Sequence, residues 1–255
     1  MRDKITSLTD SQWQFIEKHL NTNRKRKHSM RIVFDAILWV NSTGTQWRNI
    51  QGYPFIWQVV YYYFRKWKNE GLFFKILRDV VTQERKRQGK DPEASLVAFD
   101  SQSVKKGMFV SIETGIDGNK KINGRKRHLA VDVLGLPLAI GISAANCYDG
   151  NEGLKLFPIV QKATSKLELI RVDNTYKGEF VLVAEKEFSW KVEFGQKPES
   201  TKGFIPQKGR WQIERCFAWL NPFRRLDKDH EKTVESSAAF ISLAFISILL
   251  GRIPT

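Results

Sequence analysis

Three acidic residues, Asp100, Asp173 and Glu214, have the residue type and the local setting of a site for divalent metal ions. Asp100 directly follows the apolar run 96–99, and Asp173 directly follows the apolar segment 167–172. Both segments are typical of buried strands. Because ligands bind in the crevice beyond the strand ends of a sheet flanked by helices, we expect the two aspartates at such an edge.

Carboxylates gathered in this way need cations between them, because two unit charges about 4 Å apart repel by about 4 kcal/mol at an effective dielectric constant of about 20. Magnesium prefers carboxylate, water and phosphate oxygens as ligands. Two such ions, roughly 3.5–4 Å apart, activate an attacking oxygen and stabilise a leaving one during displacement at phosphorus. In a chain with 27 acidic residues the spacing alone is weak evidence, and the strand-end positions strengthen it. The predicted cofactor is Mg²⁺ or Mn²⁺, as two ions that act on phosphodiesters.

The elements around these acids occur in an order that predicts one fold. Apolar runs and turn residues predict strands at 96–99, 127–133, 136–144, 167–172 and 190–194, a loop at 107–124, and helices at 151–163, 180–188 and 211–220. The first three strands are joined closely enough to be antiparallel. This is the order of a ribonuclease-H-like, retroviral-integrase-type fold, an α+β or α/β domain with a mixed sheet flanked by helices. Its first and fourth strands are neighbours, so Asp100 and Asp173 would lie side by side, and Glu214 on a later helix would complete the cluster.

The first third of the chain is predicted to be all-helical. Apolar periodicity predicts helices that begin near Thr9, where Gln12 suggests a capping box, and near Ser29, with two more around 56–68 and 73–80. The third of these carries Arg65, Lys66 and Lys68 and has the layout of the recognition helix of a helix-turn-helix module. A small helical bundle with an aromatic core is the alternative. We expect a DNA-binding domain with its linker at 1–90 and a catalytic domain at 91–255.

The overall charge indicates a polyanionic partner. The chain has 42 Lys and Arg against 27 Asp and Glu, a formal charge of +15, and a pI of about 9.8. Nucleic acid is the usual partner of so basic a protein, and a merely basic protein is the alternative. Cys147 and Cys216 lie too far apart for a metal clip and fit a reducing compartment.

No signal peptide or membrane segment is expected. The apolar run 238–250 is interrupted by Ser242 and Ser247 and is shorter than the roughly 20 residues that span a bilayer. We interpret it as a buried helix or a protein contact.

Several motifs resemble a known family. The segments 99–104 (Phe-Asp-Ser-Gln-Ser-Val), 124–128 (Gly-Arg-Lys-Arg-His) and 211–220 (Trp-Gln-Ile-Glu-Arg-Cys-Phe-Ala-Trp-Leu) resemble bacterial insertion-sequence transposases of the DDE class. The closest group is the one related to eukaryotic Harbinger elements. The segments 8–13 and 43–48 resemble that group's helical N-terminal domain, so the resemblance covers nearly the whole chain.

The resemblance implies that Asp100, Asp173 and Glu214 are the three catalytic, metal-binding acids. For the second acid the chain departs from the family, which more often has a glycine before Tyr176, and Asp149 is the alternative. The implied reaction is cleavage of both transposon ends by activated water, followed by attack of the freed 3′-hydroxyl on target DNA.

Basic residues are expected to contact the DNA. Arg125, Lys126 and Arg127 are predicted phosphate contacts, with a solvated loop as the alternative. The resemblance pairs Arg210 with Glu214 and requires Arg224 or Arg225 as a further basic residue.

The implied partners are double-stranded DNA, as terminal inverted repeats and as target, and further copies of the chain in a homodimer or larger assembly. The implied location is the bacterial cytoplasm, at the nucleoid. Two other functions remain open: a transposase-derived DNA-binding protein that no longer cuts, and a metal-dependent nuclease without strand transfer.

Overall fold

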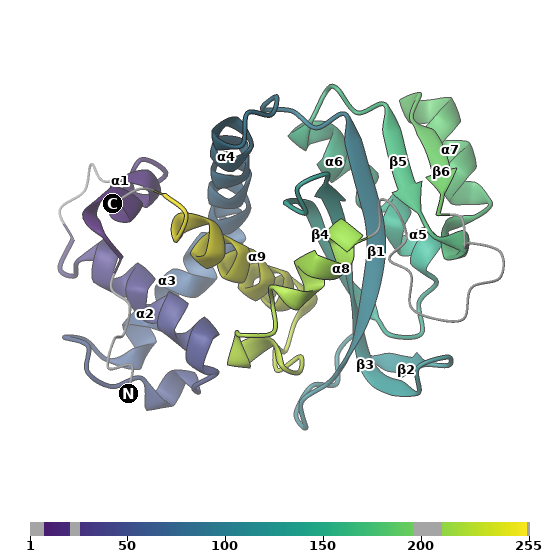
Figure 1. Cartoon of the computed structure of the whole chain (residues 1–255). Coiled ribbons are helices and arrows are strands. Elements are labelled where there is room, and N and C mark those ends of the chain that lie inside the picture. The colour runs from purple at the N-terminus through teal and green to yellow at the C-terminus, as the bar shows by residue number, and fades with distance from the viewer. Residues whose placement is uncertain (1–7, 21–25, 196–210, 254–255) are drawn as a thin grey trace. The chain divides into compact units, whose positions relative to one another are not determined.

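The computed structural model describes residues 8–20, 26–195 and 211–253 (Figure 1). The chain forms two compact units. A helical unit comprises the chain up to Val80, Leu220–Asp227 and the chain from Ala239, and a sheet unit comprises Val81–Trp219 and Lys228–Ala238. The chain thus enters the helical unit three times, whereas the predicted domains 1–90 and 91–255 are consecutive. The division into independently folding domains at residues 1–90 and 91–255 remains a prediction.

The helical unit confirms the predicted helices of the N-terminal third. They are α1 (Asp10–Glu17), α2 (Met30–Thr43), the short 3₁₀ helix η1 (Trp47–Asn49), α3 (Trp57–Asn69) and α4 (Leu72–Arg87), which runs on into the sheet unit. Thr9 and Gln12 form the predicted capping box at α1. Helix α2 ends at Gly44, whose left-handed backbone (φ 71°) is easily adopted by glycine.

The apolar run near the C-terminus forms α9 (Val234–Leu250), and its later part packs inside the helical unit. Phe240 stacks on Phe64 with ring centroids 4.8 Å apart and lies 5.9 Å from Trp47. Its carbonyl accepts a hydrogen bond of 3.1 Å from Asn41 Nδ2. The prediction of a buried helix is therefore confirmed, and no helix within the described ranges is long and apolar enough to cross a membrane.

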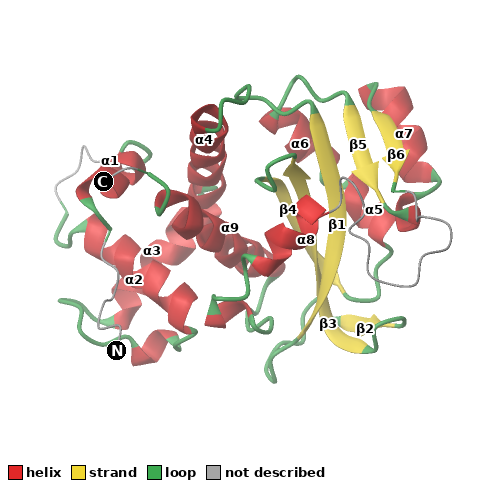
Figure 2. Ribbon diagram, viewed as in Figure 1, coloured by secondary structure: helices red, strands yellow, loops and turns green. Residues whose placement is uncertain are grey.

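The sheet unit contains one mixed sheet (Figure 2). Its strands are β1 (Leu96–Lys105), β2 (Gly115–Asp117), β3 (Ile122–Asp132), β4 (Pro137–Ala144), β5 (Leu169–Val172) and β6 (Lys191–Phe194). Strand β3 pairs antiparallel with β1, β2 and β4, whereas β5 runs parallel to both β1 and β6. The first and fourth predicted strands, now β1 and β5, are neighbours, which confirms the ribonuclease-H-like order.

Helices cover the two faces of this sheet. They are α5 (Asp149–Leu154), α6 (Phe157–Ala163), α7 (Glu179–Phe188) and α8 (Trp211–Ala218), with short 3₁₀ turns η2 (Asn174–Tyr176) and, in the helical unit, η3 (Arg224–Leu226). The single helix predicted over 151–163 is wrong. Pro158 lies in the first turn of α6 and has no N–H to continue a helix from α5.

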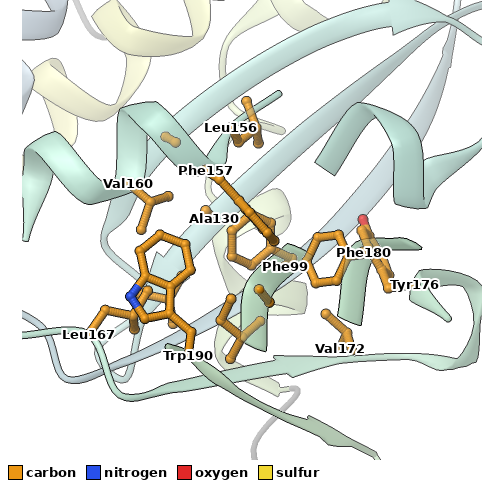
Figure 3. Packing of buried hydrophobic residues seen from close by; sticks show 14 of the residues in the cluster. Phe99, Ala130, Leu156, Phe157, Val160, Leu167, Val172, Tyr176, Phe180 and Trp190 are labelled. Atoms are coloured by element: carbon orange, nitrogen blue, oxygen red, sulfur yellow. The ribbon is translucent and has the colours of Figure 1, made fainter. Parts of the chain in front are cut away.

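An aromatic core fills the space between the sheet and helices α5 to α7 (Figure 3). Phe157 and Phe180 meet edge to face at 4.7 Å, and Phe99 from the central strand packs against both. Val172 at the end of β5 belongs to the same cluster. This core fixes which face of β1 and β5 points inward.

A polar group is buried at the edge of this packing. His128 on β3 is 1% exposed, and its Nε2 lies 2.8 Å from Ser143 Oγ. Burial lowers the pKa of His128 from its ordinary value of 6.5 to about 4, although Asp149 and Glu152 act in the opposite direction. Folded His128 is therefore neutral at pH values where an unfolded histidine binds a proton.

The depressed pKa of His128 makes the sheet unit less stable as the pH falls from about 6.5 to about 4. In this window the unfolded chain takes up a proton that the folded chain excludes, which costs up to about 3 kcal/mol of unfolding free energy. Urea unfolding followed by near-ultraviolet circular dichroism across this pH range measures the slope. His128→Gln, which places an amide that does not titrate near Ser143, should flatten the slope. An equal slope of unfolding free energy against pH in the variant would contradict the attribution of this pH dependence to His128.

Candidate active site

Asp100 lies within β1, and Asp173 follows the end of the neighbouring parallel strand β5. In the register of β1 and β5, Ala98 pairs with Arg171. Asp100 and Asp173 each come two residues later, so each lies one side-chain repeat beyond the last paired residues. Asp173 directly follows β5, as expected. The expectation that Asp100 ends its strand is wrong, because β1 continues to Lys105 through its pairing with β3. The register nevertheless sets the two acids at the same level.

Both aspartates lie on the face of the sheet opposite the aromatic core. Phe99 and Val172, the preceding residues, point into that core, and successive side chains in a strand point to opposite faces. Helix α8 packs on β1 and β3 and crosses in front of β1, with α5 and α6 behind the sheet (Figure 1). The two carboxylates and the helix that carries Glu214 therefore share one face.

Local hydrogen bonds orient both carboxylates. Oδ1 of Asp100 accepts a hydrogen bond of 2.7 Å from the backbone N–H of Ser101. Asp173 caps η2, where its Oδ1 accepts from the N–H of Thr175 at 2.9 Å and from the hydroxyl of the same residue. Both side chains are half-buried. Each carboxylate is therefore oriented by a hydrogen bond and still accessible to solvent.

Glu214 is held less directly. The buried residues Ile213, Cys216 and Phe217 attach α8 to the sheet unit. Arg215 Nη2 donates to the carbonyl of Leu134 at 2.8 Å, next to Gly135, where an added Cβ would lie 2.9 Å from the Gln212 carbonyl. Glu214 itself is exposed.

The carboxylate pair fits a hard divalent cation in its chemistry. Carboxylate oxygens on one sheet face, open to water and phosphate oxygens, are the donors that Mg²⁺ prefers. Within the residues that the structure describes, however, no three His, Cys, Asp or Glu side chains lie close enough to hold one ion together. The joining of Glu214 to the aspartate pair is therefore a proposal.

Arg125, predicted to contact DNA, is instead a buried structural residue, and that prediction is wrong. Its side chain is 0% exposed and lies 3.1 Å from the equally buried carboxylate of Asp229. All five of its N–H groups are used inside the protein: the other acceptors are the carbonyls of Ile112 (2.6 Å), Glu113 (3.3 Å), Glu231 (2.9 Å) and Lys232 (3.2 Å). No donor is left for a phosphate.

The two residues that follow Arg125 are also turned inward, contrary to their predicted role. Lys126 Nζ lies 2.9 Å from Asp149 and donates to the carbonyl of Cys147 at 2.9 Å. Arg127 is 3% exposed. For Arg125 and Lys126 the physical reason is the length of β3, which begins at Ile122 rather than 127, so both lie within the sheet. Asp149, the alternative second acid, is the ion-pair partner of Lys126.

The remaining basic residues differ in their exposure. Arg225 is buried in the helical unit and donates to the Thr45 carbonyl at 3.2 Å, so the structure contradicts its predicted DNA contact. Arg224 and Arg65 are exposed. Lys66 and Lys68 on α3 are half-buried, and Arg210 lies outside the described residues.

Comparisons with known proteins define the class of the chain. A family model described as "Transposase DDE domain" matches residues 91–250, and the chain therefore belongs to the family of DDE transposase domains. A second model, described as "Putative transposase of IS4/5 family", matches residues 8–77.

One relative in Burkholderia cepacia is the "Putative transposase for insertion sequence element IS402", 31% identical over 127 residues. The match covers 47% of this chain and 60% of the relative. Among solved structures, the Mos1 strand transfer complex matches 91% of this chain and 78% of that chain at 12% identity, with a TM-score of 0.32. The Mos1 paired-end complex matches 68% and 61% at 10% identity, with a TM-score of 0.26. These scores are too low to define the fold, which rests on the strand order.

Replacing Arg125 should destabilise the sheet unit strongly. Arg125→Met leaves the buried carboxylate of Asp229 without its cation, which typically costs about 3–5 kcal/mol. The half-exposed pair of Arg171 and Glu193, 3.2 Å apart, offers a matched control, because Arg171→Met should cost only about 0–1 kcal/mol. Urea unfolding measures both. Similar losses in the two variants would contradict the structural role of Arg125.

Proposed function

We propose that this protein is a DNA transposase. It binds transposon ends, cleaves them by metal-dependent hydrolysis of phosphodiesters and joins the 3′-hydroxyl ends to target DNA. The observation that supports the proposal is the register of β1 and β5, in which Asp100 and Asp173 each come two residues after the pair Ala98–Arg171, in a chain of the DDE transposase-domain family. The activity and partners of the whole protein are part of the proposal, because the chain spans about 60% of its curated relative.

Asp100, Asp173 and Glu214 are the proposed ligands of two Mg²⁺ or Mn²⁺ ions. When bound, such ions activate an attacking oxygen and neutralise the charge that develops on the leaving one. The residues of the chain contribute by holding the carboxylates in position. Asp100 within β1 and Asp173 after the end of β5 would supply two of the carboxylates, and Glu214 of α8 is the proposed third. Such a site works mainly by positioning and electrostatic stabilisation, as in other phosphoryl transfers.

Helix α3 is the proposed DNA-reading element. Arg65 lies over the ring of Tyr61, 5.9 Å from its centroid, and Tyr62 is 59% exposed. Lys66 lies 3.8 Å from Glu70, a loose surface pair that a phosphate could replace. Together with Lys68 and the exposed Arg224 they form the proposed DNA-contacting set of the helical unit, to which Arg210 is added for the catalytic helix.

The finer parts of the proposal concern its relatives and its assembly. Its motifs favour the transposase group related to Harbinger elements. A homodimer or larger assembly would hold two transposon ends at once, with double-stranded DNA as partner. The proposed place of action is the bacterial cytoplasm at the nucleoid, where that DNA lies.

A DNA-binding protein that no longer cuts is the second candidate. It is favoured by one observation: the described residues contain no group of three potential metal ligands close together. Cleavage of labelled element ends with Mg²⁺ separates the two candidates.

Loss of the Asp100 or the Asp173 carboxylate should abolish cleavage and spare DNA binding. Asp100→Asn and Asp173→Asn keep the shape of each side chain and remove the charge that a metal ion needs. Each should slow cleavage by at least the ~10²–10³-fold that loss of one transition-state hydrogen-bond donor costs. Cleavage of a labelled end in Mg²⁺ gives the rate, and a gel-shift assay gives the binding.

Asp149→Asn is the matched control for the second acid. It should retain cleavage if Asp173 is the ligand. Loss of cleavage in Asp149→Asn with activity kept in Asp173→Asn would reverse the assignment.

Removing basic residues from α3 should weaken DNA binding and flatten its salt dependence. Each lost phosphate contact lowers the slope of log affinity against log salt by about 0.9, so Arg65→Ala with Lys66→Ala should lower it by about 1.8. A fluorescence anisotropy titration at several salt concentrations measures the slope. The pair Lys162→Ala and Lys186→Ala removes the same charge from α6 and α7, where both lysines are exposed, and should leave the slope almost unchanged. An equal slope in both double variants would exclude α3 as the contact.

A further inference from the structure

The loop between β1 and β2, residues 106–114, exposes large apolar side chains. Met108 is 89% exposed and Phe109 is 87% exposed, and Ile112 is 52% exposed. Ile116, on the short strand that follows, is 59% exposed. Single exposed apolar residues are common on protein surfaces, but a contiguous group of large ones marks an interaction site. We call Met108, Phe109 and Ile112 the apolar tip.

The base of this loop is fixed. The N–H of Gly107 donates to the carbonyl of Asp229 at 2.7 Å, and the N–H of Lys106 donates to that of Asn123 at 3.1 Å. Arg125 binds the carbonyls of Ile112 and Glu113 from inside. Val110, between the exposed residues, is 3% exposed and anchors the loop. The chain therefore holds the apolar tip out in water on a rigid support.

Four lysines lie at the same end of the sheet as the apolar tip. Lys105 and Lys106 precede it, and Lys120 and Lys121 lie at the turn between β2 and β3, which pairs with β1 at this end. Within the described ranges none of these four lysines forms an ion pair with a carboxylate of the chain. Their charge is available to a polyanion. A second copy of this chain carries the same formal charge of +15 and would be repelled at this surface.

We propose that the apolar tip is a wedge that inserts between base pairs of duplex DNA. Proteins that bend DNA insert Phe, Met, Leu or Ile side chains between base steps, and nearby basic residues hold the phosphates on either side. Met108 and Phe109 supply the apolar side chains, and the four lysines supply the phosphate contacts. The rigid base keeps the wedge from folding back when it meets the duplex. This inference rests on the proposed function in one respect, that the partner is DNA.

Fluorescence of 2-aminopurine tests the wedge, because this base brightens when its stacking is broken. The probe is a short duplex in which every adenine of one strand is 2-aminopurine, so that the position of binding does not matter. Addition of the full chain should raise the fluorescence. Met108→Ser with Phe109→Ser should abolish the rise while anisotropy on the same duplex still reports binding. Both side chains are exposed, so this variant should fold, which circular dichroism checks.

Leu182→Ser is the matched control, because Leu182 on α7 is 54% exposed and lies outside the loop; it should keep the full rise. A rise that survives in the double variant, or binding of the parent chain without a rise, overturns the wedge and leaves the proposed function intact. Absence of any DNA binding by the parent chain overturns both. If the double variant instead changes only the sedimentation of the protein, or only its binding to anionic lipid vesicles, the tip contacts a second copy or a membrane, and the DNA wedge is refuted.

Discussion

Backbone pairing of β1 on both of its edges is the constraint on which the rest of the sheet unit depends. Its antiparallel register with β3 extends from Val97–Asp132 to Lys105–Gly124, whereas its parallel register with β5 ends at Ala98–Arg171. Asp100 and Asp173 each come two residues beyond that last pair. The same strand continues past the acids to the loop that carries the apolar tip, so one element connects the candidate active site to the proposed DNA wedge.

Some arginines form ion pairs and hydrogen bonds inside the protein, so the net charge overestimates the basic surface that could contact DNA. Arg85 forms a buried ion pair with Asp132, and Arg125 gives all five donors to buried acceptors. Such residues stabilise the fold only while every partner is present. Part of the +15 charge is therefore structural and does not measure the charge that can meet DNA.

Most of the fold could be predicted, because buried strands and amphipathic helices have local patterns. The apolar runs before Asp100 and Asp173, the capping box of α1 and the buried α9 were all visible in the sequence. Strand β2 and the first half of β3 were not. Residues 115–126 are polar and rich in lysine and glycine. They form strands through pairing, the first half of β3 with β1 and β2 with β3, which is an effect of context on strand propensity.

The order of residues was enough to specify the buried runs before the two aspartates, the helical character of the first third and the family, because each depends on neighbours within a few positions along the chain. The inward turn of Arg125 could not be inferred in this way, since its partner Asp229 lies 104 residues later. The same holds for the common face of Asp100, Asp173 and α8. Strand register and helix packing set both, and those contacts exist only once distant segments have come together.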